Sequence, residues 1–98
     1  MSAKKKKFLG TVTILGRTFR VIEVPKLVSG DDELQGEIDA YKLTICMAKE
    51  REPDTLLHEV LHGTEAALGL GLTEQQVTAL ARALWSAGCR IRPVKQPL

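Results

Sequence analysis

The spacing of apolar residues changes at Pro53, and this change constrains the fold more than any other feature of the sequence. Before Pro53, β-branched and apolar residues tend to alternate with polar ones, which is the period of a β-strand. After it, apolar residues recur at intervals of three and four, which is the period of one helical face. With 98 residues, the chain has room for one domain. The sequence therefore predicts an α+β domain in which a small antiparallel sheet of about three strands precedes two packed helices.

Three strands are predicted in the first half of the chain. The segment 11–25, TVTILGRTFRVIEVP, is rich in β-branched residues around a Gly16-Arg17 turn, as in a β-hairpin. The polar, glycine-bounded segment 29–36 predicts a loop. The segment 37–47 then alternates apolar and polar residues towards its end, as expected of a third strand.

Two helices are predicted in the second half. Pro53 suits the first turn of a helix over 54–68, because its missing amide hydrogen has no partner there, and Gly69 ends that helix. Thr73 and Gln76 have the spacing of a capping box at the start of a second helix. The residues expected to face inward are Leu57, Val60, Leu61, Thr64 and Leu68 in the first helix and Val77, Leu80, Ala81, Leu84 and Trp85 in the second.

A run of four lysines, Lys4 to Lys7, accounts for the net charge of +2. Residues 8–98 hold ten basic and twelve acidic residues, which is a net charge of −2. We predict that 1–7 is a disordered basic leader, that 8–88 is the single domain and that 89–98 is an irregular tail. A nucleic-acid-associated function based on the lysines is an alternative, although they lack the interleaved aromatic residues that a single-strand binder requires.

The chain shows no signal that would direct it to a membrane or out of the cytoplasm. Its uninterrupted apolar runs are only a few residues long, against about 20 needed to cross a bilayer, and its basic start is not followed by a secretory apolar core. Cys46 and Cys89 lack the spacing of metal or redox sites, so we expect two buried free thiols, with a single disulfide as the alternative. The sequence therefore predicts a cytoplasmic protein without a membrane partner.

The first predicted helix contains HEVLH, an HExxH string in which His58 and His62 are the only histidines of the chain. Residues four apart lie one turn apart on the same helical face, so both imidazoles can bind one metal ion. Glu59 lies about 100° round the helix from His58, where its carboxylate can act as general base on a water at the metal. Chance gives two histidines at this spacing, with glutamate after the first, in about one arrangement in six hundred. The alternative, an amphipathic helix with two unrelated histidines on its polar face, is therefore weaker.

A catalytic zinc ion has three protein ligands and an open position for water, so a carboxylate or cysteine must supply the third ligand. Glu74 is the best candidate because it opens the second helix on the same stripe as the inward-facing Val77. A simpler explanation for Glu74 is its favourable place at the positive end of the helix dipole. Glu65, on the histidine stripe, and Cys89, past the second helix, are rival ligands. Zn²⁺ is the default ion for two imidazoles and one carboxylate.

The run TLLHEVLHG at 55–63, the glycine-leucine linker and the run TEQQVTALARAL at 73–84 resemble the minimal zinc metallopeptidase domains found in phage genomes, which are similar to the ImmA/IrrE and SprT-type peptidases. The resemblance covers roughly residues 36–86. It implies a zincin-like fold with a small sheet whose edge strand can pair with an extended peptide. The site residues that it implies are His58 and His62 as zinc ligands, Glu59 as the base and Glu74 as the third ligand.

On this interpretation the chain is an HExxH-type zinc metallopeptidase that hydrolyses a protein or peptide substrate extended along the third strand, in the host cytoplasm if it is phage-encoded. Another class is a zincin-like module that binds zinc and a partner protein without turnover. Tyr41 is the only phenol available to stabilise an oxyanion, although a tyrosine in a strand more often packs or covers an edge. The sequence specifies neither the substrate nor the oligomeric state.

Overall fold

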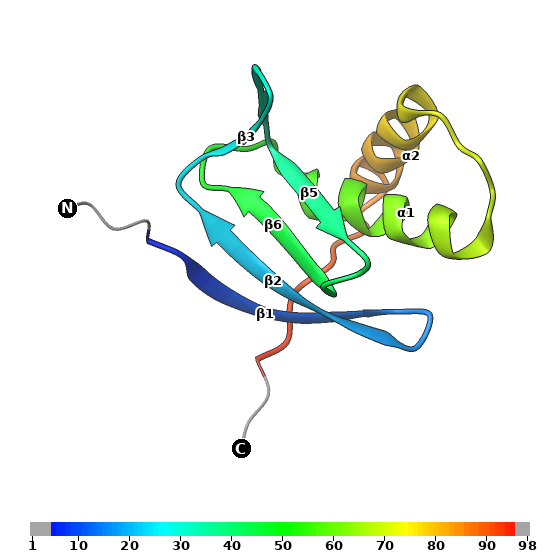
Figure 1. The fold of residues 1–98 in the computed structure, drawn as a ribbon. Coiled ribbons are helices and arrows are strands. Elements are labelled where there is room, and N and C mark those ends of the chain that lie inside the picture. The colour runs from blue at the N-terminus through cyan, green and yellow to red at the C-terminus, as the bar shows by residue number, and fades with distance from the viewer. Residues whose placement is uncertain (1–4, 96–98) are drawn as a thin grey trace.

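The structure, a computed structural model, describes residues 5–95, and within them the chain forms six strands and then two helices (Figure 1). The strands are β1 (Lys7–Ile14), β2 (Arg17–Val24), β3 (Leu27–Ser29), β4 (Asp32–Leu34), β5 (Gly36–Asp39) and β6 (Thr44–Ala48), and the helices are α1 (Thr55–Leu68) and α2 (Glu74–Ser86). This arrangement confirms the α+β class. Within residues 5–95, neither helix is long and apolar enough to cross a bilayer.

The sheet is mixed and has four strands in the order β1-β2-β6-β5, with β3 and β4 paired as a separate hairpin. β1 and β2 form the predicted antiparallel hairpin. β6 then pairs with β2 in parallel, whereas the sequence predicted an antiparallel sheet, and β5 pairs with β6 antiparallel. The parallel pair arises because the chain reverses once through the β3–β4 hairpin and again between β5 and β6, so that β6 returns in the direction of β2.

The structure corrects two further predictions in this region. The predicted loop at 29–36 contains most of the β3–β4 hairpin, and the predicted strand at 37–47 is two strands separated by a turn. Asp39 explains the break, because its carboxylate accepts hydrogen bonds from the backbone N–H groups of Tyr41 at 2.9 Å and Lys42 at 3.0 Å. An aspartate that bonds to the backbone in this way forms an Asx turn, which reverses the chain.

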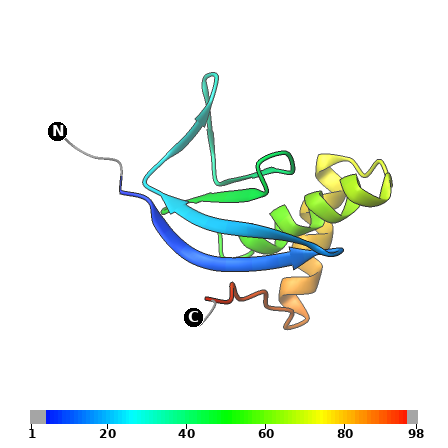
Figure 2. The same ribbon diagram turned by 60° about the horizontal axis from the view of Figure 1, so that its bottom comes forward.

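The hydrophobic core lies between the sheet and α1, which crosses one face of the sheet (Figure 2). Val21 of β2 and Ile45 of β6 are fully buried at its centre. Partly buried residues of β5 and α1, among them Ile38 and Val60, pack against this cluster. The buried apolar residues of the core are Val12, Ile14, Phe19, Val21, Ile45, Met47 and Leu56.

The face of α1 that packs on the sheet is rotated from the predicted one. Leu57 is buried and Val60 packs against the core as predicted, but Leu56, Glu59 and Gly63 are also buried, and Leu68 of the predicted stripe is 56% exposed. Gly63 makes the close approach possible, because a Cβ there would lie only 2.7 Å from Cδ1 of Ile38. Glycine and glutamate do not contribute to an apolar pattern, and so the pattern could not identify this face.

α2 packs mainly on α1. The predicted capping box is present: the Thr73 hydroxyl accepts a hydrogen bond from the Gln76 N–H, and the Gln76 side-chain oxygen accepts one from the Thr73 N–H. Val77 and Ala81 are buried as predicted, but Leu80 is 42% exposed. The inward stripe of α2 is therefore narrower than its sequence indicated.

The first and the last described segments both reach the sheet. Residues 1–4 of the predicted leader and 96–98 of the predicted tail lie outside the described residues, while β1 already begins at Lys7. In the tail, Val94 and Thr11 pair through two backbone hydrogen bonds of 2.9 Å, an isolated antiparallel bridge. The C-terminal segment runs beside β1 in Figure 2 and covers part of its outer edge.

Candidate metal centre

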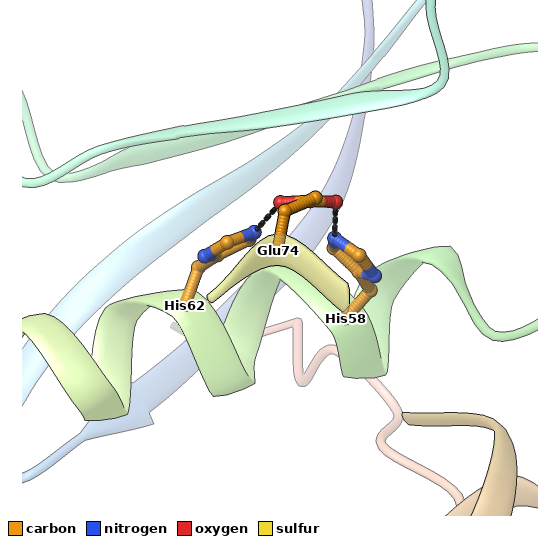
Figure 3. A group of neighbouring side chains, drawn as sticks. All are labelled: His58, His62 and Glu74. Carbon is orange, nitrogen blue, oxygen red and sulfur yellow. Dashed lines mark hydrogen bonds and ion pairs between the residues drawn. The ribbon is translucent and has the colours of Figure 1, made fainter. Parts of the chain in front are cut away.

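The side chains of His58, His62 and Glu74 converge between α1 and α2 (Figure 3). Oε2 of Glu74 lies 2.9 Å from Nε2 of His58, and Oε1 of Glu74 lies 2.7 Å from Nε2 of His62. The imidazole rings have centroids 4.8 Å apart and planes inclined at 66°. The structure therefore brings together the three residues that the sequence selected as metal ligands.

The short connection between the helices positions Glu74. Gly69 and Gly71 adopt left-handed backbone conformations, with φ of +66° and +68°, which glycine accommodates without strain. The Glu65 carboxylate accepts a hydrogen bond of 3.1 Å from the N–H of Leu72 and so ties this connection to α1. The chain consequently reverses within a few residues, and the first residue of α2 faces the histidines.

The rival third ligands lie elsewhere. Glu65 holds the connection through its bond to the Leu72 N–H. Cys89 is a free, exposed thiol past the end of α2, so the expectation that it is buried is wrong, while Cys46 is half-buried and also free. Tyr41 is 97% exposed in the turn after β5 and does not line the cleft described below. Of the candidate third ligands, the structure brings Glu74 to the histidines.

The donor set fits a divalent cation. Ligand atoms around a tetrahedral zinc ion lie about 2.0–2.2 Å from the metal and therefore about 3.3 Å from one another. One ligand atom from each of His58, His62 and Glu74 already lies within 4.8 Å of the others. Two imidazoles and one carboxylate leave the fourth position of the ion open.

Glu59 is buried on the side of α1 that faces β5. It is 7% exposed, and a Cβ on Gly36 would lie 3.1 Å from its Oε2. Burial raises the pKa of Glu59 to about 7, opposed by the charge of His62 and reinforced by the carboxylates of Glu74 and Glu37. A carboxyl group with a pKa near neutrality can both accept and release a proton at physiological pH.

A cleft of about 280 Å³ opens beside His58, between the two helices and the segment that joins β4 to β5. Gln35 fixes this wall, because its side-chain oxygen accepts hydrogen bonds from the Glu52 N–H at 2.9 Å and the Thr55 hydroxyl at 3.2 Å. No local pattern in the sequence indicated this wall, since its residues lie in the segment predicted to be a loop. The residues that the wall contributes are Glu33, Leu34, Gln35 and Gly36.

The arrangement contains the groups that metal-assisted hydrolysis requires. It offers three convergent ligands, a carboxyl group that titrates near neutrality and an adjoining cleft. The ligands come from two helices, so a bound ion would also hold α1 to α2. Comparisons with family models, with curated proteins and with solved structures return no match for this chain.

Proposed function

We propose that the protein is a zinc-dependent metallopeptidase that hydrolyses peptide bonds in a protein or peptide substrate. The observation that carries the proposal is the convergence of His58, His62 and Glu74 next to the buried carboxyl group of Glu59. A bound Zn²⁺ supplies a Lewis acid for the attacking water and the scissile carbonyl. The enzyme is expected to act in the cytoplasm, where free thiols such as Cys46 persist.

The side chains of the site have separate roles in this proposal. His58, His62 and Glu74 would hold the ion, and three protein ligands would leave one position for the reacting groups. Glu59 would accept the proton of the attacking water and later donate it to the leaving amine. Gly36 has no side chain to cover the Glu59 carboxyl, which lines the cleft.

The position of β5 suits an extended substrate. β5 is an edge strand of the sheet, and Gly36 at its start lines the cleft beside His58. An extended peptide that adds to a sheet edge gains main-chain hydrogen bonds along its length. A peptide paired with β5 would therefore pass the metal centre with its backbone held in place.

Metal content and hydrolysis, measured on the same samples, test the proposal. Elemental analysis of natively purified protein should find one zinc ion per chain, and His58→Ala, His62→Ala and Glu74→Ala should each lose it. Glu59→Gln should keep the zinc and lose at least about 100-fold in peptide hydrolysis, because the amide cannot act as a base. Glu50→Gln, which changes an exposed carboxylate outside the cleft, is the matched control and should keep both properties.

Two outcomes would overturn this function. Zinc content unchanged by His58→Ala and His62→Ala would place the metal elsewhere. If the protein holds one zinc ion per chain and binds peptides of a random library but cleaves none of them, it is an interaction module without turnover.

A further inference from the structure

The cleft beside His58 carries more acidic side chains than the proposed chemistry uses. Glu59 and Glu74 line it and have roles in that chemistry. The other charged groups that line it are three carboxylates and one guanidinium, a net formal charge of −2. These groups belong to Glu33, Glu52, Asp54 and Arg82.

The three additional carboxylates make no ion pair or helix-capping hydrogen bond among the described residues. None of the ion pairs within residues 5–95 includes Glu33, Glu52 or Asp54. Asp54 is the N-cap residue of α1, yet its side chain makes no capping hydrogen bond. The contacts of Glu52 with Gln35 and Thr55 use only its backbone, which any residue provides. The three carboxylates therefore line the cleft without an ion-pair partner among the described residues.

Glu59 gives an independent indication that the cleft receives a ligand. Its side chain is nine-tenths buried and lines the cleft. Within residues 5–95, the ion pairs and the side-chain hydrogen bonds around the site do not include the Glu59 carboxyl. No fully buried side-chain oxygen or nitrogen of the described residues lacks a partner, so the unpartnered Glu59 oxygens are open to the cleft, where a ligand can reach them.

We propose that this acidic cleft selects peptides with a lysine or arginine side chain close to the scissile bond. The inference rests on the proposed peptidase function. His58 lines the cleft and His62 does not, so the cleft lies at the end of the metal centre nearest the N-terminus of α1. An extended peptide that crosses the centre therefore places residues on one side of its scissile bond over Glu33, Glu52 and Asp54.

The size and charge of the cleft define the preference. Its volume of about 280 Å³ lies just below the usual range for ligand sites, about 300–1,000 Å³, which suits one long side chain rather than a folded partner. Opposite charges attract a lysine or arginine, whereas an acidic side chain would meet like charges at a cost. Arg82 is the one lining cation, so Arg82→Gln should strengthen the preference.

Fluorogenic peptides that differ at a single position test this selection. Each set carries lysine, arginine, norleucine or glutamate at one position on either side of the scissile bond. The kcat/KM for lysine should exceed that for norleucine by about tenfold on one side only, and the excess should shrink as salt screens the charges. Glutamate at that position should be the poorest substrate.

Variants of the cleft assign the preference to its carboxylates. Glu33→Gln and Asp54→Asn should each reduce the lysine-to-norleucine ratio by about threefold, and the double variant should bring it near one. Glu50→Gln should leave the ratio unchanged, because Glu50 lies outside the cleft. A ratio of rates for one protein sample does not depend on how much of that sample is folded.

Binding to zinc-loaded Glu59→Gln separates the two proposals. If the wild type cleaves nothing but this variant binds the lysine peptide more tightly than the norleucine peptide, the charge preference holds and the peptidase function is wrong. If the wild type cleaves both peptides equally well, the function holds and the selection for cations is wrong. Equal binding without cleavage overturns both.

Discussion

Replacing Glu59 with glutamine should make the metal-free protein more stable, and more so as the pH rises. Burial raises the pKa of this carboxyl from 4.5 to about 7, so the folded protein favours the neutral acid. The stability linked to its protonation is complete below pH 4.5, the unfolded value, and is lost as the pH rises through about 7. Glutamine has nearly the same shape and no charge to bury.

The size of the effect follows from the two pKa values. With 4.5 in the unfolded chain and about 7 in the folded one, Glu59 destabilises the fold by about 1 kcal/mol at pH 5 and about 3 kcal/mol at pH 8, at about 1.36 kcal/mol per pH unit. The cost of burying the glutamine amide is the same at both pH values. The advantage of Glu59→Gln should therefore grow by about 2 kcal/mol over this interval.

Urea unfolding in the presence of a chelator, followed by far-ultraviolet circular dichroism at pH 5 and pH 8, measures this difference. Glu50→Gln, an exposed carboxylate, is the control and should show no such growth. An advantage of the same size at both pH values would refute the argument that the ionised form of Glu59 is what burial disfavours. A confirmed result would mean that the proposed catalytic base is held in place at the expense of stability.

Three further predictions concern the elements that support the site. Gly63→Ala should lower the free energy of unfolding by about 1–3 kcal/mol, because its Cβ would lie 2.7 Å from Ile38; a melting temperature equal to that of the wild type would contradict this close approach. Arg51 forms a 2.7 Å ion pair with Glu23 and lowers the pKa of that carboxyl below its ordinary value of 4.5. The pair should stabilise the fold by about 0.5 kcal/mol above pH 4.5, and this stability should be lost as the pH falls through the lowered pKa of Glu23 in the folded protein. Glu23→Gln should therefore be less stable than the wild type at pH 7 and equal to it in strong acid, as urea midpoints would report. Thr73→Ala should cost about 1 kcal/mol by removing the cap of α2, and a chelator competition should show weaker zinc binding because the third ligand follows directly.

The sequence alone was enough to nominate the candidate site. The HExxH spacing puts His58 and His62 one turn apart in any α-helix, and the capping box of Thr73 starts α2 immediately before Glu74. Both features depend on contacts within a single helical turn. Neighbours in the sequence therefore specify them without help from the rest of the fold.

The wall of the cleft and the packed face of α1 depended on the whole fold. Alternating residues show which side of a strand is apolar but not which strand lies beside it, so the place of β6 between β2 and β5 could not be predicted. Gly63 and Gly36 matter because other segments approach them closely, which no local pattern records.

The convergence of His58, His62 and Glu74 also depends partly on local sequence and partly on tertiary packing. Residue identity and the helical period determined which side chains could bind a metal. From the sequence, Gly69 could be recognised as a helix stop and Gly71 as part of a linker, but the left-handed conformation of both is known only from the structure. The packing of α2 on α1 decided that Glu74 reaches within 2.7 Å of His62. Helical period acts over one turn, whereas the distance between two helices depends on every residue that packs between them.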